Sequence, residues 1–234
     1  MKSPERKNRL LRYFTVMEKG LWSTSALLII LAFFLFDRKN LLNLCASLVG
    51  VTSLIFNAKG NPVGQVLMVL FSLMYGVISW SFRYYGEMIT YLGMTMPMAV
   101  VALVSWLKNP FNGNRAEVKV YRLSVPETLF AFALSTLVSV GFYFILAYFH
   151  TANLLLSTLS VFTSFLAVYL TFRRSPWFTI AYAANDIVLV GLWALASRSN
   201  PSYLSVMVCF VAFLANDIYG FISWRRMQLR QAAA

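Results

Sequence analysis

Apolar stretches of nearly bilayer-spanning length recur eight times along this chain of 234 residues. A membrane-spanning helix needs about 20 predominantly apolar residues. The stretches cover approximately residues 21–36, 41–58, 63–82, 88–107, 128–149, 152–172, 176–196 and 203–224. They are apolar and aromatic on all sides, whereas the strands of a membrane barrel alternate polar and apolar residues. The sequence therefore predicts an all-α polytopic membrane protein with eight transmembrane helices.

The composition excludes most other classes of protein. Charged residues make up 12% of the chain and hydrophobic residues 59%, so the charged fraction is about half that of a typical soluble domain. The two cysteines, Cys45 and Cys209, lie in apolar stretches, and His150 is the single histidine. This pattern predicts no disulfide framework, no metal site and no cofactor.

The basic residues predict the orientation in the membrane. If the spans alternate in direction, all but four of the 20 Lys and Arg residues fall on the side of the N-terminus. The exceptions are Arg38, Lys39, Arg83 and Arg198. Cytoplasmic loops carry such an excess, so we expect both termini in the cytoplasm. The same bias accounts for the net charge of +12 without a nucleic-acid partner.

The longest polar connection, residues 108–127, divides the spans into two sets of four. Residues 50–53 resemble residues 161–164, and both Ser105-Trp106 and Ser223-Trp224 precede basic residues at the end of a span. We therefore expect spans two to four to repeat, in the same direction, as spans six to eight. Parallel repeats are typical of transporters that hold substrate between their halves. The expected segments are a basic N-terminus with an extra helix (1–40), a three-helix bundle (41–107), a basic loop with a linker helix (108–150), a second three-helix bundle (151–225) and a tail (226–234).

Two acidic residues, Asp186 and Asp217, fall within predicted spans, and the other six acids fall in loops or near span ends. Each follows an asparagine, Asn185 or Asn216, in the repeated sequence Ala-Asn-Asp-Ile. At about 1.5 Å per residue, both Asn-Asp pairs lie roughly 12–14 Å from the basic boundary. A charge inside a span costs about 2.5–3.5 kcal/mol on insertion scales. We therefore favour a ligand site over purely interhelical hydrogen bonding, which remains the alternative.

Aromatic and amide side chains accompany the two pairs. Trp177, Tyr182 and Tyr219 are spaced to share their face, and Gln65 and Asn57 lie in the inner half of neighbouring spans. Aromatic walls, amides and carboxylates suit a flat, polar, cationic ring. The sequence has neither a phosphate-binding glycine loop nor a cationic residue in mid-span.

Other residues in the spans predict packing and anchoring. A serine stripe with Tyr75 beside it in the third span predicts close helix packing. A tryptophan follows each Ala-Asn-Asp-Ile sequence after five more residues, at Trp193 and Trp224. These tryptophans fall near opposite membrane faces, so we expect them to anchor the helices at the interfaces.

The chain resembles the PnuC family of bacterial vitamin transporters from about Leu42 to the C-terminus. The likeness is carried by Gly64-Gln65, by residues 85–87 (Tyr-Gly-Glu), by the segment from Trp177 to Asp186, and by residues 216–220 (Asn-Asp-Ile-Tyr-Gly) with Trp224. The first span is similar to the extra N-terminal helix of some members. No single motif is diagnostic, and the order of the motifs and the layout of the spans carry the likeness.

The resemblance implies a SWEET-like 3+1+3 arrangement, here preceded by one more helix, in a bacterial inner membrane. It implies facilitated diffusion of nicotinamide riboside, which a cytoplasmic kinase then traps, and it is compatible with homo-oligomers. It also implies an aromatic sandwich and amide contacts for the substrate. We assign ring stacking to Trp177 and Tyr182, hydrogen bonds to Asn185, Asn216 and Gln65, and counter-charge or support to Asp186 and Asp217. The weaker candidates are Tyr219, Asn57, Tyr85 and Glu87.

Alternative functions remain open. Thiamine is also a flat cation, so a thiamine transporter of the same fold is one alternative. A proton-coupled transporter using Asp186 or Asp217 as the relay is another, and a membrane scaffold without a ligand is a third. An intramembrane aspartyl enzyme is disfavoured because no glycine-flanked motif that admits water surrounds either aspartate. We therefore expect a transporter without catalytic residues.

Overall fold

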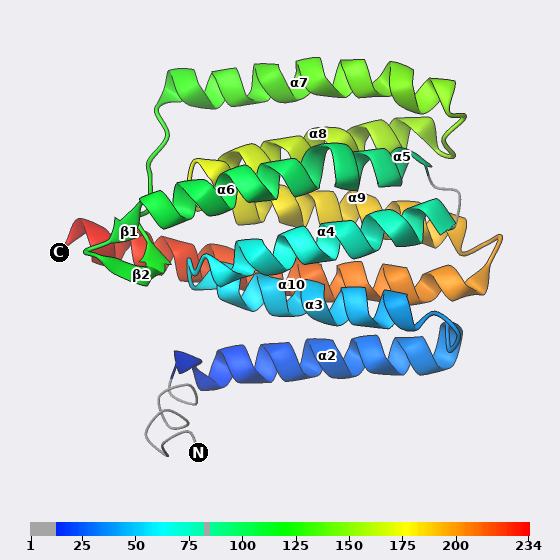
Figure 1. Ribbon diagram of the computed structural model, residues 1–234, viewed down its shortest axis with the longest axis horizontal. Helices are drawn as coiled ribbons and strands as arrows, with labels where there is room; N and C mark the ends of the chain where they lie inside the picture. Colours follow the sequence, from blue (N-terminus) through cyan, green and yellow to red (C-terminus); the bar gives the residue numbers. More distant parts are fainter. Residues whose placement is uncertain (1–12, 82–84) are drawn as a thin grey trace.

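Eight helices long and apolar enough to span a membrane are present in the computed structural model, among the residues that it describes, 13–81 and 85–234. The basic segment before residue 13 and Arg83 lie outside the described residues. The prediction of eight helical spans is confirmed. The first described residues, the C-terminus and the short hairpin lie at one end of an elongated bundle (Figure 1), which we call the basic end.

Seven of the spans are single helices; five match the expected stretches closely, whereas α2 begins five residues earlier than expected and α10 ends eight residues later. The bounds are α2 Val16–Phe36, α3 Leu41–Ala58, α4 Val63–Ser81, α7 Val125–Tyr148, α8 Leu154–Phe172, α9 Phe178–Ala196 and α10 Leu204–Ala232, which a 3-10 turn, η2 Pro201–Tyr203, precedes. The fourth span is built from three consecutive pieces, α5 Tyr85–Ile89, the π-helical η1 Thr90–Thr95 and α6 Met96–Lys108. Short π-helical segments are frequent at functional sites.

Local sequence signals explain where helices begin. Thr15 caps α2 in a capping box with Glu18, and the Asn40 side chain accepts a hydrogen bond from the backbone of Asn43 at the start of α3. Ser124 caps α7 in the same way, with Pro126 in the first turn. These side chains satisfy backbone N–H groups that have no intrahelical partner.

The polar connection between the two halves is folded. Strands β1 (Pro110–Phe111) and β2 (Asn114–Val118) form an antiparallel hairpin. The backbone N–H of Val118 donates to Gly60 O at 2.9 Å, and Gln231 Nε2 donates to Glu117 Oε1 at 2.8 Å. The hairpin therefore connects the α3–α4 turn to the end of α10.

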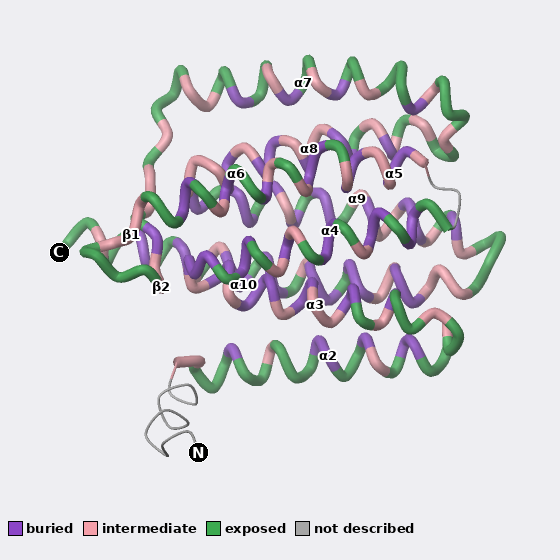
Figure 2. The backbone as a smooth tube through the Cα atoms, in the orientation of Figure 1, coloured by how far each residue is buried: buried purple, intermediate pink, exposed green. Residues whose placement is uncertain are grey.

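Two three-helix bundles form the centre of the molecule. Helix α4 packs on α3 and α6 in the first bundle, and α9 packs on α8 and α10 in the second. The bundles meet along two seams, α3 with α10 and α6 with α8. Helix α2 packs on α3 and α10, and α7 packs on α8. Figure 2 shows these two helices as the most exposed of the set.

Equivalent hydrogen bonds join the bundles at the basic end. Trp106 Nε1 donates to Thr171 O at 2.9 Å, and Trp224 Nε1 donates to Asn57 O at 2.7 Å. The serine before each tryptophan adds a second bond: Ser105 Oγ donates to Phe172 O at 2.9 Å, and Ser223 Oγ donates to Ala58 O at 2.7 Å. The indole rings of Trp106 and Trp224 meet with centroids 5.5 Å apart. We call these paired contacts the tryptophan locks, and they confirm the predicted parallel repeat.

The prediction that Trp193 and Trp224 anchor the helices at the membrane interfaces is wrong. Both side chains are fully buried. Trp224 forms one of the locks, and Trp193 packs edge-on against Tyr75 and Tyr203 with centroids 6.3 and 5.5 Å away. Position along a span does not tell whether a tryptophan faces lipid or a neighbouring helix.

Close helix packing, in contrast, follows the small residues as expected. A Cβ atom on Gly50 would lie 2.3 Å from Phe213 Cζ, so α3 approaches α10 at this point. A Cβ atom on Gly64 would lie 2.7 Å from the backbone nitrogen of Asn57. Glycine therefore permits both helix contacts.

Candidate substrate-binding site

The two aspartates of the repeated sequence meet at the interface of α9 and α10. Asp186 and Asp217 are both buried, and their carboxyl groups are close enough to interact directly. The two aspartates therefore lie at one level of the bundle, and their depth in the membrane stays a prediction. Two carboxyl groups this close repel each other when both are ionised. The pair is therefore chemically suited to hold a proton or a cationic group.

The two asparagines point to neighbouring helices. Asn185 Oδ1 accepts a hydrogen bond from Thr163 Oγ1 of α8 at 2.9 Å. Asn216 Nδ2 donates to Ser25 Oγ of α2 at 2.9 Å. Interhelical hydrogen bonding, the alternative role of the Asn-Asp pairs, is therefore the role of the two asparagines. Adjacent residues on a helix point about 100° apart, which lets each aspartate face its counterpart.

A cluster of aromatic rings contributed by both bundles lies beside the aspartates. Tyr75 of α4 and Tyr91 of η1 have centroids 4.3 Å apart. Tyr75 also contacts Phe71, at 5.5 Å, and Phe210 of α10, at 5.8 Å. Tyr91 lies within electrostatic range of Asp186. We call the set Phe71, Tyr75, Tyr91, Trp193, Phe210 and Phe213 the aromatic cluster.

Sequence reasoning missed Tyr91 and mentioned Tyr75 only as a neighbour of the serine stripe. Two signals could have identified them. Tyr91 lies one helical turn after Glu87, and Tyr75 lies between Ser72 and Ser79 at spacings of three and four. Residues with those spacings share a helix face.

Buried polar atoms next to the aromatic cluster lack partners. Three such atoms have no hydrogen-bond partner among the described residues: Ser72 Oγ, Ser79 Oγ and Glu87 Oε2. Most buried polar atoms in proteins are hydrogen-bonded, so such a group indicates capacity for a ligand. Glu18 and Glu87 lie in the first turns of α2 and α5, near span ends as expected, and both are buried.

Gln65 and Asn57 are satisfied by each other at the turn between α3 and α4. Gln65 Nε2 donates to Asn57 Oδ1 at 2.9 Å, and Asn57 Nδ2 donates to Ser53 Oγ at 3.3 Å. Both residues are buried near the basic end. This network stabilises the α3–α4 turn, where Asn57 O accepts the hydrogen bond of one tryptophan lock.

The predicted tyrosines lie in three different places. Half-buried Tyr182 lies within electrostatic range of Asp217. Tyr219 Oη donates to Glu18 Oε1 of α2 at 3.0 Å. Tyr85 contacts Phe149 at the end of the bundle opposite the basic end, with centroids 6.3 Å apart. The structure thus brings Tyr182 to the aspartates and places the other two elsewhere.

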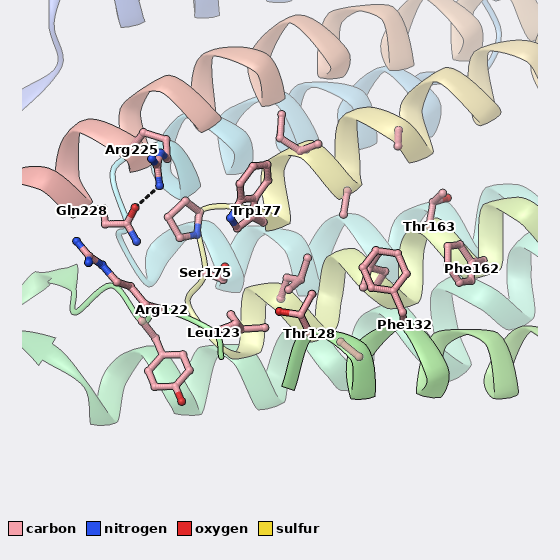
Figure 3. A pocket seen from close by; sticks show the side chains of 18 of the residues that line it. Arg122, Leu123, Thr128, Phe132, Phe162, Thr163, Ser175, Trp177, Arg225 and Gln228 are labelled. Carbon is pink, nitrogen blue, oxygen red and sulfur yellow. Dashed lines mark hydrogen bonds between the residues drawn. The ribbon is translucent and has the colours of Figure 1, made fainter. Parts of the chain in front are cut away.

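Trp177 lies on the outer surface and is 54% exposed. It packs on Phe221, with centroids 5.2 Å apart, and lines a groove between α7 and α9 (Figure 3). Eight residues separate it from Asn185, which at 3.6 residues per turn leaves the two about 80° apart. The expectation that it shares the face of Asn185 therefore does not describe this structure.

Comparisons with known proteins agree with this architecture. Residues 40–226 match the family described as nicotinamide mononucleotide transporter. Over 206 residues the chain is 27% identical to the nicotinamide riboside transporter PnuC of Neisseria mucosa, covering 85% of this chain and 77% of that protein. It is also similar to the crystal structure of the vitamin B3 transporter PnuC, with a TM-score of 0.82 at 24% identity over 93% of this chain and 94% of that one.

Proposed function

Since this chain belongs to the nicotinamide mononucleotide transporter family, we propose that it moves nicotinamide riboside across the membrane by facilitated diffusion. The observation that carries this proposal is the aspartate pair beside the aromatic cluster, between two repeated bundles. The riboside contains a flat pyridinium cation. Aromatic faces attract such a cation, and carboxylates stabilise it strongly where water is excluded. We assign the substrate contacts to Tyr75, Tyr91, Tyr182, Asp186 and Asp217, with Glu87 nearby.

The charge distribution favours the riboside over the mononucleotide. In the described helices, Lys and Arg occur only near the basic end, at Lys19, Lys108, Arg225, Arg226 and Arg230. A phosphate group crossing the middle of the bundle would therefore meet carboxylates and no compensating cation. The relative from Neisseria mucosa is likewise named for the riboside.

The orientation and the direction of net transport form part of the proposal. We place the basic end, with both termini, in the cytoplasm of a bacterial inner membrane, because basic residues are concentrated there. Rocking of one bundle against the other would expose the central site to each side in turn. Phosphorylation inside the cell would then keep the substrate gradient inward.

The test is uptake of labelled nicotinamide riboside into liposomes that contain the purified protein. We expect saturable uptake that excess riboside inhibits and that the mononucleotide and riboflavin inhibit poorly. Asp186→Asn should lower uptake at least tenfold, because a hydrogen bond to a charged group contributes about 1.5–3 kcal/mol. Arg115→Gln, on the exposed hairpin, is the matched control and should transport normally. Uptake of thiamine alone would transfer the substrate assignment to thiamine, and no saturable uptake of either vitamin would refute transport of both.

A proton-coupled mechanism is the second candidate, and the close approach of two buried carboxyl groups favours it. In that case an inward proton gradient should accelerate uptake in wild-type protein and leave Asp217→Asn unaffected. Facilitated diffusion predicts equal initial rates with and without the gradient.

A further inference from the structure

A groove of about 770 Å³ opens on the outer side of the second bundle, separate from the aspartate pair. This volume falls within the range of about 300–1,000 Å³ that is usual for small-molecule sites. The groove lies between α7 and α9, with α8 as its floor and the end of α10 at its mouth. Its apolar wall includes Ala131, Phe132, Phe162, Leu166, Ile180 and Ala184.

The mouth of the groove is basic. Arg122 precedes α7 and Arg225 lies near the end of α10, and both side chains are exposed. Figure 3 shows them gathered with Gln228 at one end of the groove, opposite Phe162 and Thr163. Arg225 Nη1 donates to Gln228 Oε1 at 2.6 Å. Among the described residues neither arginine has a carboxylate partner, whereas nearby Arg173 pairs with Glu127.

Two opposed chemistries thus meet in one cavity: an apolar channel, and at its end two guanidinium groups that have no carboxylate partner among the described residues. Guanidinium groups bind phosphate with paired, charge-assisted hydrogen bonds. Basic pockets between transmembrane helices on the cytoplasmic side bind anionic lipid head groups. An apolar channel of this kind holds water poorly.

We propose that the groove binds one anionic phospholipid. Its acyl chain lies between α7 and α9, and its phosphate contacts Arg122 and Arg225. The site also gives a role to Trp177, whose apolar ring lines the groove close to the basic end. An indole is well suited to that level of a bilayer, where one edge is apolar and the other is wet.

The experiment is a lipid titration of the delipidated full-length protein in neutral detergent, followed by native mass spectrometry. We expect one phosphatidylglycerol to bind preferentially over phosphatidylcholine with the same acyl chains. The double variant R122Q/R225Q should bind it about 30-fold more weakly, because each basic residue near an anionic head group contributes roughly fivefold. The double variant R115Q/K119Q removes the same charge from two exposed positions, one on the hairpin and one directly after it, and should bind like the wild type.

Three further outcomes decide the proposal. Ala184→Trp fills the channel and should abolish binding while the melting temperature and elution volume stay unchanged. Equal binding by R122Q/R225Q, or by Ala184→Trp, would overturn the site. Displacement by inorganic phosphate at the same concentration as by lipid would show a site for free anions instead, and a disulfide between two copies of Ala184→Cys would show that a second copy covers the groove.

Discussion

The two bundles of this protein share a mechanical contact and differ in their central chemistry. Each closes on the other through one tryptophan lock, with Trp106 reaching Thr171 and Trp224 reaching Asn57. At the centre, the first bundle supplies the neutral rings of Tyr75 and Tyr91 and the second supplies the aspartate pair. The repeat therefore preserves the tryptophan locks between the bundles. The proposed binding residues need not repeat, because together they have to fit only one substrate.

This comparison predicts that damage to the centre and damage to the joints will have different signatures. A central residue should affect transport and leave stability largely intact. A residue at a joint should affect stability in whichever bundle carries it. The following changes separate the two, from the largest expected effect to the smallest.

The largest effect is expected from Asp217→Leu. Loss of the carboxylate removes the proposed charged contact with the substrate, so uptake should fall on the order of 100-fold, equivalent to about 2.7 kcal/mol. Liposome uptake measures this, with Asp37→Asn in the loop before α3 as the matched control. If Asp217→Leu were to transport at the normal rate, the aspartate pair would be structural.

Gly64→Ala should damage the first bundle at its corner. The added methyl would lie 2.7 Å from the backbone nitrogen of Asn57, and overpacking of this kind typically costs about 1–3 kcal/mol. Gly191→Ala in α9 is the control, because a Cβ there has nothing within 4 Å. Thermal unfolding in detergent should show a lower melting temperature for Gly64→Ala alone. Equal melting temperatures would contradict the close approach.

Loss of either tryptophan lock should lower the stability of the protein by the same amount. Trp106→Phe and Trp224→Phe each remove one indole hydrogen bond, worth about 1 kcal/mol, or roughly 2–4 °C in melting temperature for a chain of this length. Differential scanning fluorimetry of both variants gives the comparison. A shift in only one of them would show that the two locks are unequal.

The smallest effect is expected from Ser72→Ala. Ser72 Oγ has no partner among the described residues, so its removal should not change the melting temperature. Its loss should weaken substrate binding by about two- to tenfold if it bonds the ligand. Ser53→Ala is the contrasting variant, because Ser53 Oγ donates to Gly64 O at 2.8 Å and its loss should reduce stability.

The surroundings of Asp37, which lies in the loop between α2 and α3, shift the pKa of its carboxyl group. Partial burial raises the pKa of the Asp37 carboxyl above its ordinary value, and this outweighs the hydrogen bond that Asn43 donates to it. The raised folded-state pKa means that ionisation of Asp37 opposes folding. Asp37→Asn should therefore be tolerated at neutral pH, which supports its use as a control.

The spans and the repeat could be predicted because they depend on position along the chain. Hydropathy locates a helix in the bilayer, and a repeated Ser-Trp or Ala-Asn-Asp-Ile sequence marks its depth. Rotation about the helix axis could not be predicted equally well. These helices are apolar on most sides, so only a few small polar residues, such as the serine stripe of the third span, indicate which side chains turn inward.

The individual errors follow from this limit. Trp193 and Trp224 have the depth of interface residues but are turned into the protein. Trp177 has a spacing close to that of the site but is turned outward. Tyr91 was missed because Glu87, one helical turn before it, was expected near a span end and so did not mark a buried face of the fourth span.

Helix α7 sets the direction in which the second bundle crosses the membrane. Three helices begin on one side of a membrane and end on the other, so a second bundle that follows directly would be inverted. One additional crossing restores the direction, and its sequence need only be apolar enough to cross. Only 22% of the most apolar stretch of α7 is buried within the protein, against 56% for α8. The chain requires α7 to restore the direction of the second bundle more than to bury it, and α7 forms one wall of the proposed lipid groove.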